Sequence, residues 1–194
     1  MITIAQLKFI MPTRVMPSAG LYCVLLNPAM ELYGINTYLR EAAFLATVAH
    51  ESSEFKFLDE IWGPTPAQEG YEGRADLGNI KPGDGFKFRG RGAIQITGRS
   101  NYLETGTALG LDLIMTPELL QSPVWAVTSA CWWWHKNGCN ELADIPDFKK
   151  VTRRVNGGLN GYPDRKKYYD RALATLKPPD FSNVKAGVTS VQPK

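Results

Sequence analysis

The feature that most constrains this chain is an apolar run that ends on a carboxylate. Residues 42–51 read "AAFLATVAHE", and Thr37 stands where the N-cap of a helix is expected. A helix that is apolar on nearly every face lies buried. The sequence therefore predicts a central helix with Glu51 at its end, and a carboxylate in that position is a candidate catalytic group.

Further helix signals fill most of the chain. Ser100 and Gly110 bound one expected helix, Ser122 and Gly138 bound the next, and two more are expected over residues 148–156 and 164–176. The glycines and prolines of residues 63–92 predict a long loop, and "AIQIT" after it predicts a short strand, part of a small β element around residues 86–97. We expect a mostly α-helical single domain over residues 1–177, followed by a flexible tail at 178–194.

Composition excludes several classes of protein. A net charge of +3 without clustered Lys and Arg argues against nucleic-acid binding but suits approach to an anionic polymer. Three cysteines are too few for a disulfide framework, although a bridge between Cys131 and Cys139 stays open. Lys8 and Pro12 interrupt the N-terminal segment, so we expect neither a signal peptide nor stable membrane insertion. We expect synthesis in the cytoplasm.

A second glutamate, Glu60, follows Glu51 by nine positions. In one continuous helix the two carboxylates would lie on opposite faces, roughly 13 Å apart along the axis. Phe55, Phe57 and Leu58 break the helical pattern, which predicts that the helix ends near residue 52 or 53 and that the chain folds back. Both carboxylates would then face one cleft.

Two carboxylates across a cleft are typical of glycoside hydrolysis. Inverting enzymes hold them about 6.5 to 9.5 Å apart and retaining enzymes about 5 to 5.5 Å apart. Glu51, at the end of a buried helix, is expected to hold a proton as general acid, and Glu60, in a more open segment, to stay ionised. From spacing alone, a surface charge at Glu60 and a structural helix end at Glu51 remain an alternative.

Three segments in order, "AAFLATVAHES", "GDGFKFRGRGAIQITGRSNY" and "RRVNGGLNGYPDR", resemble glycoside hydrolase family 19, which implies a mostly α-helical, lysozyme-like and chitinase-like fold. The resemblance covers about residues 36–176 and is strongest to the phage endolysins of that family. It implies Glu51 as acid, Glu60 as base and Thr97 as the hydroxyl that holds the attacking water. The implied sugar-binding residues are Gln95, Asn101, Asn156 and Arg165. Asn156 also fits a helix C-cap before Gly157.

The chain lacks the several cysteines of the plant chitinases, and Ser100 replaces an aromatic residue before Asn101. The resemblance therefore implies an endolysin that needs no metal or other cofactor and cuts the β-1,4 bonds of the peptidoglycan glycan strand. It would act as a monomer, made in the host bacterial cytoplasm and reaching the periplasmic cell wall after a holin-type pore permeabilises the inner membrane.

Four other activities remain as alternatives: a chitinase, a zinc amidase, a lytic transglycosylase and a sugar-binding module without catalysis. The zinc site would use Cys131, His135 and Cys139, whose spacing suits one helical face, although Gly138 is expected to end the helix first. In "WWWH", at most one or two tryptophans can reach a cleft. The glycines of "RGRG" are expected to let backbone approach a sugar, and His50 either orients Glu51 or packs.

Overall fold

The computed structural model describes residues 1–13 and 18–178, which fold into helices joined by turns and loops. In chain order, with 3-10 helices marked η, the elements are α1 (Ile4–Ile10), α2 (Ala19–Leu32), α3 (Tyr38–Glu51), α4 (Pro66–Glu69), η2 (Ala75–Leu77), α5 (Asp84–Lys87), α6 (Arg99–Leu109), η3 (Pro117–Gln121), α7 (Pro123–Lys136), α8 (Cys139–Ala143), α9 (Phe148–Asn156) and α10 (Tyr162–Leu176). Within these described ranges, no helix is both long enough and apolar enough to span a bilayer.

The central helix is α3, as the apolar run predicts. The Thr37 side chain accepts a hydrogen bond from the Arg40 N–H and caps the helix, and every residue of 42–49 is buried. The most extensive contact of α3 is with α10, which also packs on α1, while α2 packs on α7. The edge of the Phe44 ring meets the fully buried Trp134 ring of α7, with 5.4 Å between centroids. The apolar run thus forms the middle of the core.

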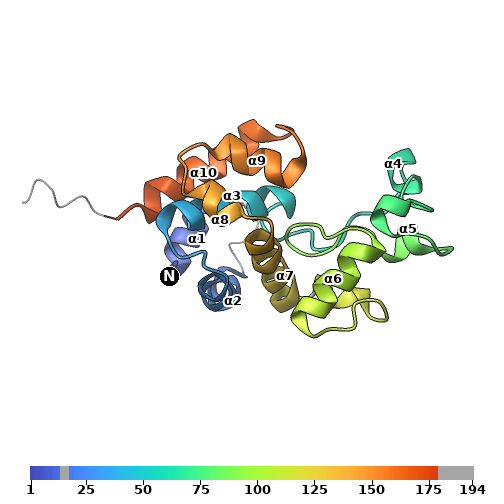
Figure 1. Cartoon of the computed structure of the whole chain (residues 1–194). Helices are drawn as coiled ribbons and strands as arrows, with labels where there is room; N and C mark the ends of the chain where they lie inside the picture. Colours follow the sequence, from blue (N-terminus) through green and yellow to red (C-terminus); the bar gives the residue numbers. More distant parts are fainter. Residues whose placement is uncertain (14–17, 179–194) are drawn as a thin grey trace, which may run out of the picture.

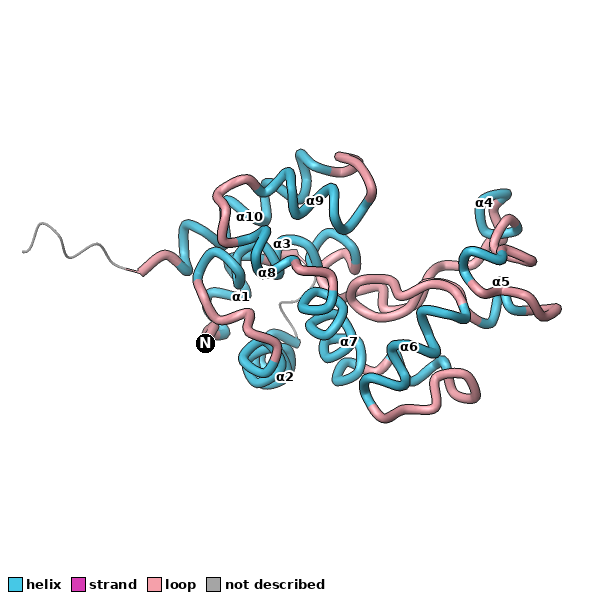
Figure 2. Tube along the Cα trace, viewed as in Figure 1, coloured by secondary structure: helices cyan, strands magenta, loops and turns pink. Residues whose placement is uncertain are grey.

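The elements divide into two groups in space (Figure 1). We call the group around α3 and α10, with α1, α2, α8 and α9, the helical lobe. We call residues 58–110, which carry α4, α5 and α6, the loop-rich lobe. Helix α7 lies between the two groups, and Figure 2 shows a long loop, in pink, crossing from the helical lobe toward α5. This crossing loop carries several of the candidate site residues.

The expected strand over residues 93–97 is wrong in detail. The described residues pair there only as isolated bridges, Asp59 with Arg91 and Arg91 with Ile96. The Arg91 and Ile96 backbones exchange hydrogen bonds of 3.0 and 2.8 Å and so close a tight turn, in which Gln95 takes a φ of +58°. A left-handed residue cannot continue a strand, because it turns the chain out of the extended direction. The small β element is therefore reduced to two bridges around a turn.

Two helix ends can be compared with the ends that the sequence predicts. Helix α3 ends at Glu51 with Ser52 as its C-cap, as predicted. Ser100, however, does not cap α6, because the helix begins at Arg99 after Gly98. The Arg99 N–H is satisfied by the Asn79 side chain at 2.8 Å, a partner from another segment that no local pattern reveals. Residues 179–194 of the expected tail lie outside the described residues.

Candidate active site

A left-handed turn follows α3 and sends the chain back toward the site. Ser53, Glu54 and Phe55 have φ values of 49°, 61° and 62°. Each such residue costs roughly 1–2 kcal/mol, so neighbouring contacts must hold the turn. The Ser52 hydroxyl donates to the Val48 carbonyl at 2.6 Å and accepts the Phe55 N–H at 2.8 Å. The fold-back that the sequence predicts is therefore present and is fixed by the residue that caps α3.

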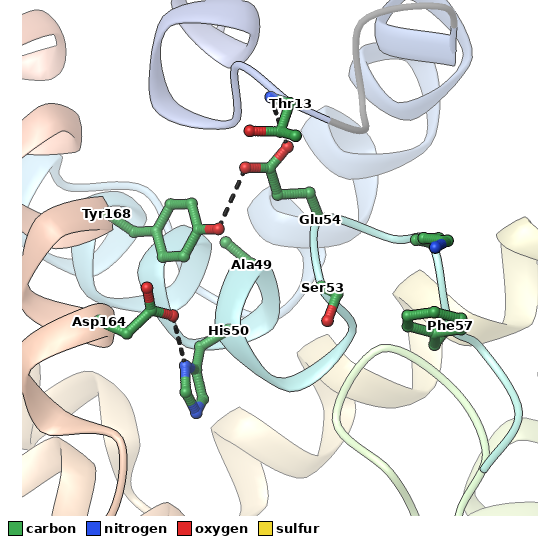
Figure 3. A pocket seen from close by; sticks show the side chains of 9 residues that line it. Thr13, Ala49, His50, Ser53, Glu54, Phe57, Asp164 and Tyr168 are labelled. Carbon is green, nitrogen blue, oxygen red and sulfur yellow. Dashed lines mark hydrogen bonds and ion pairs between the residues drawn. The ribbon is translucent and has the colours of Figure 1, made fainter. Parts of the chain in front are cut away.

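The same turn is anchored on its far side by Glu54, which is 3% exposed. Its carboxylate accepts hydrogen bonds from the Thr13 N–H at 2.8 Å and from the Tyr168 hydroxyl at 3.1 Å. Figure 3 shows Glu54 and Tyr168 facing each other across a pocket, with His50 and Asp164 paired beside them. Burial, and after it the Glu54 charge, raises the pKa of Tyr168, so this hydroxyl stays a donor at neutral pH. The hydrogen bonds around this pocket hold the C-terminal end of α3 in place.

Glu51 is held by one charged partner. Nη2 of Arg165 donates to Glu51 Oε1 at 2.5 Å, and the two side chains are 3% and 21% exposed. Arg165 comes from the first turn of α10, so the pair joins the two helices that pack most closely. Arg165 had been expected to bind sugar. Its burial against Glu51 makes it a residue that positions the carboxylate, and its contact with sugar stays a prediction.

Glu60 is held by three neutral donors. Its Oε2 accepts the Gly90 N–H at 2.9 Å, and its Oε1 accepts from Gln68 Nε2 at 3.0 Å and from the Tyr71 hydroxyl at 3.4 Å. The Glu60 N–H in turn donates to the Gly90 carbonyl at 2.8 Å. Burial, and then the charge of Glu60, raises the pKa of Tyr71, which keeps that hydroxyl protonated. Three neutral donors fix the orientation of the Glu60 carboxylate, and a general base needs a fixed position relative to the proton that it takes.

Gly90 is the point around which the loop-rich part of the site is assembled. A Cβ atom on this residue would lie 2.7 Å from Gln95 Oε1 and 3.3 Å from both Glu60 Oε2 and Thr97 Oγ1. These three side chains therefore surround a space that only glycine leaves open. The glycine of "RGRG" had been expected to admit a sugar. Instead it admits the side chains that form the site.

A cavity of about 270 Å³ lies between the lobes and brings most of the sequence-predicted residues together. Its lining consists of Glu51, Leu77, Ile94, Gln95, Ile96, Thr97, Asn101, Trp133, Val155 and Asn156. Glu60 and Arg165 do not line it, but the Glu60 carboxylate lies beside the same Gly90 Cβ position as the Gln95 and Thr97 side chains, and Arg165 donates to Glu51. The carboxylate of the helical lobe and the hydroxyl of the loop-rich lobe thus border the same space.

The three amides of the cavity are each anchored to backbone. Gln95 donates to the Gly92 carbonyl at 2.9 Å, Asn101 to the Thr97 carbonyl at 2.7 Å and Asn156 to the Asn160 carbonyl at 3.1 Å. A side-chain amide has two N–H donors and an acceptor, so each retains groups that can bind a ligand. Asn156 is also the last residue of α9, and the C-cap that follows it is Gly157 at a φ of +69°, so the expected C-cap role of Asn156 is wrong by one position, while its contact with sugar stays a prediction.

Several residues that support the site carry no signal in the sequence. The Glu60 donors Gln68 and Tyr71 lie in and directly after α4, a helix of only four residues, and no spacing in the sequence relates them to Glu60. The sequence predicts that at most one or two tryptophans of "WWWH" reach a cleft. Trp133 lines the cavity, whereas its neighbour Trp134 is fully buried. Helical spacing places these two rings in different directions, which the sequence does predict, but it does not say which ring faces inward.

Two arginines, the buried Arg91 and the partly buried Arg89, stiffen the loop that carries Gly90. Asp59 pairs with Arg89 at 2.6 Å and with Arg91 at 3.2 Å. The Arg91 guanidinium also donates to the Tyr102 hydroxyl at 2.9 Å, and that hydroxyl donates to the Arg89 carbonyl at 2.6 Å. Burial raises the pKa of Tyr102, so the chain of hydrogen bonds persists at neutral pH. The loop holds its shape without strand pairing.

Cys131 and Cys139 are free and buried, so the possible bridge is not formed. Burial raises the pKa of the Cys139 thiol to about 12. Gly138, at a φ of +65°, separates α7 from α8, as the sequence predicts, and places Cys139 outside the helix of Cys131 and His135. Within residues 1–13 and 18–178, no group of three or more His, Cys, Asp or Glu side chains has the arrangement of a metal site.

His50 points away from the acid. Its Nδ1 lies 2.8 Å from Asp164 Oδ2, and its ring lies so close to Gly161 that a Cβ there would approach it to 2.5 Å. His50 lines the pocket of Figure 3, not the cavity that contains Glu51. Of the two roles left open for His50, the structure gives it packing and pairing at the junction of α3 and α10.

A helical domain with one carboxylate at the end of a core helix, a second on an adjoining loop and amides between them has the arrangement of a glycosidase. The family model described as "Chitinase class I", Glyco_hydro_19, matches residues 35–162. A Haemophilus influenzae protein named "Glycosyl hydrolase family 19 domain-containing protein" is 34% identical over 192 residues, covering 84% of this chain and 93% of its own length. The chain belongs to glycoside hydrolase family 19.

Solved and curated chitinases are similar as well. Chitinase C from Streptomyces griseus matches with a TM-score of 0.69 and 25% identity, covering 93% of this chain and 79% of its own. An Arabidopsis thaliana endochitinase is 38% identical over 118 residues, which are 60% of this chain and 39% of the plant protein. The chain thus spans only about two fifths of that plant relative. The expected mostly α-helical, chitinase-like fold is confirmed.

Proposed function

We propose that this glycoside hydrolase is an endolysin that cuts β-1,4 bonds between the N-acetylated amino sugars of bacterial peptidoglycan, with inversion. The observation that carries the proposal is the cavity lined by Glu51, Gln95 and Thr97, together with the Glu60 carboxylate, which lies beside the same Gly90 Cβ position as the Gln95 and Thr97 side chains. Glu51 protonates the leaving oxygen, Glu60 takes a proton from the attacking water, and Thr97 positions that water.

The amides and the tryptophan of the cavity support a sugar ligand. Gln95, Asn101 and Asn156 offer directional donors and acceptors for hydroxyl and acetamido groups, and the Trp133 ring offers an apolar surface for a sugar face. The net charge of +3 supports an anionic substrate such as peptidoglycan. The absence of disulfides among the described cysteines supports synthesis in a reducing compartment, unlike that of the plant enzymes.

The direct test is a digest of purified peptidoglycan followed by mass spectrometry of the fragments. New reducing ends are expected, and NMR of the first product should show the inverted anomer. Anhydro-sugar ends would indicate a lytic transglycosylase, and release of peptide without glycan cleavage would indicate an amidase. Either result would overturn the proposal.

Chitin hydrolysis is the second candidate, and it is favoured by the relatives that are named chitinases. Chitin and peptidoglycan share the β-1,4-linked N-acetylated backbone, so one cavity can in principle admit both. Parallel digests of chitin oligomers and cell walls separate the two. Cleavage of chitin alone would replace the endolysin proposal.

The endolysin proposal includes a cellular route. We propose that the protein is made in the host cytoplasm as a monomer and reaches the wall only after a separate holin-type pore opens the inner membrane, without inserting in the membrane or binding nucleic acid. Expression in bacteria without such a pore should leave the cells intact. Lysis of those cells would contradict the proposed route.

A further inference from the structure

Helix α9, Phe148–Asn156, has two chemically distinct faces. Phe148, Val151 and Thr152 are buried. The other side carries four exposed cations, Lys149, Lys150, Arg153 and Arg154. The four cations lie within six consecutive positions, so this is the densest positive segment of the helical lobe.

Carboxylates neutralise other surface cations but not these. Arg40 pairs with Asp144 and Lys166 with Asp170, whereas no Asp or Glu oxygen in the described chain comes within 4.0 Å of the charged nitrogens of the four α9 cations. Two acids do lie near α9. The first, Asp147, caps the helix by accepting the Lys149 N–H at 3.2 Å.

The second acid is Glu141, which faces Arg154 across Gly138, so Arg154 is partly balanced. Arg154 also donates to the Asn137 carbonyl at 2.7 Å. The remaining three, Lys149, Lys150 and Arg153, form what we call the α9 cationic face.

This arrangement is unfavourable for the helix itself. Lys149 and Lys150 lie in the first turn, where the helix dipole disfavours cations and where α9 has no acidic residue. Lys149 and Arg153 are also like charges at i and i+4, which repel. The cation of Lys149 has one partial compensation, the Tyr162 ring at 5.8 Å. Since the fold gains little from these charges, a ligand outside the chain is the better explanation for them.

The α9 cationic face runs up to the substrate cavity. Val155 and Asn156, at the C-terminal end of α9, line that cavity. Lys149 is seven residues before Asn156, a distance of about 10 Å at 1.5 Å per residue. An extended peptide of about three residues has the same length. A branch that leaves a glycan in the cavity can therefore lie along the whole face.

We propose that the α9 cationic face binds the carboxylates of the peptide branches of peptidoglycan while the glycan strand occupies the cavity. This inference rests on the proposed function, because it adds to that function the part of the substrate that chitin lacks. Chitin is a neutral polymer, so the face has nothing to bind in it. The face would then determine which of two similar glycans the enzyme prefers.

The test compares two triple variants that remove the same charge. One is K149Q/K150Q/R153Q, and the control is K81Q/K167Q/K177Q, whose lysines are exposed and lie outside α9. The substrates are soluble uncross-linked peptidoglycan strands, the same strands after carbodiimide amidation of their carboxylates, and a chitin hexamer. The readouts are kcat and KM, measured at low and at moderate salt after circular dichroism has shown that both variants are folded.

The α9 variant should raise KM on untreated strands by about tenfold, as expected for three exposed charge contacts, with kcat nearly unchanged. Its KM on amidated strands and on chitin should match that of the wild type, and the difference on untreated strands should shrink with salt. An unchanged KM on untreated strands, an equal rise on amidated strands, or an equal rise in the control would each overturn the inference.

Failure of the proposed function gives a different result. In that case the wild type cuts the chitin hexamer but not the peptidoglycan strands. Co-sedimentation with cell walls then tests the face alone. Weaker binding by the α9 variant than by the control supports the face, and equal binding by both refutes it.

Discussion

The two carboxylates are held in opposite ways by the two lobes. In the helical lobe, Glu51 ends a 14-residue helix and is fixed by one charged partner, Arg165, from the helix packed beside it. In the loop-rich lobe, Glu60 lies on an extended segment and is fixed by a backbone N–H and two neutral side chains. The position of the first depends on the packing of two helices, and that of the second on many separate hydrogen bonds.

This difference teaches what each lobe contributes to the proposed chemistry. Arg165 pairs with the ionised form of Glu51, so in the acid role Glu51 has to gain a proton in each turnover while the rigid helix keeps its position. A general base starts ionised, and neutral donors satisfy it without neutralising its charge. We therefore expect substitutions at the two glutamates to affect activity similarly and stability differently.

Replacing Glu51 by Gln should cause the largest loss. The amide keeps the shape of the side chain but cannot donate the proton, so activity on peptidoglycan should fall by at least about 10²- to 10⁴-fold. Stability should also fall, by about 1 to 3 kcal/mol, because the amide cannot form the ion pair that balances the buried Arg165 guanidinium in the free enzyme. Turbidity loss of outer-membrane-stripped cells measures the activity, and urea unfolding measures the stability. A folded variant that keeps more than about a tenth of the activity would remove Glu51 from the acid role.

Replacing Glu60 by Gln should reduce kcat by about 10²- to 10³-fold, since no base remains to activate the water. The free energy of unfolding should fall by only about 1 kcal/mol. The Gln side-chain oxygen can still accept the Gly90 N–H, and the one hydrogen bond lost is that from Gln68 Nε2, which would meet the amide NH2 group instead of an acceptor. The same two assays apply. If this variant lost more stability than Glu51→Gln, the contrast between a charged and a neutral clamp would be wrong.

Replacing Gly90 by Ala tests whether the loop-rich lobe assembles around that residue. The added methyl group would lie 2.7 Å from Gln95 Oε1 and 3.3 Å from Glu60 Oε2 and Thr97 Oγ1. We expect a loss of stability of about 1 to 3 kcal/mol and a fall in kcat of about 100-fold as the base moves. Gly158→Ala is the matched control, because no atom lies within 4 Å of its Cβ position. Equal kcat values in the two alanine variants would contradict the role of Gly90.

The difference between the two lobes also explains which structural features the sequence could predict. The helical lobe follows local rules: the apolar run, the Thr37 cap and the end at Ser52 are all visible in consecutive residues. The loop-rich lobe depends on contacts between distant segments. Asn79 satisfies the start of α6, and Gln68 holds Glu60, and neither contact leaves a local pattern.

The site shows the same division. Its residue types were found through resemblance to a family, while their arrangement follows from the tertiary structure. Arg165, a predicted sugar contact, also holds Glu51, because the packing of α10 on α3 turns it inward. Gln95 was placed on a strand and lies instead in a left-handed turn, which brings its amide beside Gly90. Periodicity reports which face of an element is apolar but not which distant segment it meets.

Acid should weaken the loop-rich lobe through Asp84. This buried carboxylate pairs with Arg99 at 2.5 Å and joins α5 to α6. The hydrogen bond from Arg99 is the main cause that lowers the pKa of Asp84. Because the folded-state pKa lies below the unfolded value of about 3.9, the pair stabilises the protein above that pH and the stabilisation is lost as pH falls through the folded-state pKa.

The test is Asp84→Asn, which should cost about 2 kcal/mol at pH 7. Urea unfolding at a series of pH values should show the gap between wild type and variant narrowing below about pH 4. Activity at pH 7 should change little in the folded variant, since Asp84 does not line the cavity. A gap that stayed constant into the acid range would contradict the assigned ion pair.

Thr97 should give the smallest effect of the site residues. Its hydroxyl already donates to the Gln95 carbonyl at 3.1 Å, so it can position the attacking water only by accepting a hydrogen bond from it. Solvent can partly replace such a contact, and Thr97→Val should therefore lower kcat by about tenfold or less. Thr97→Ser restores the hydroxyl and should recover nearly all of the activity, which separates loss of the hydroxyl from loss of packing. A fall in the valine variant as large as that of Glu60→Gln would mean that the hydroxyl does more than position water, and the division of labour between the carboxylates would then have to include Thr97.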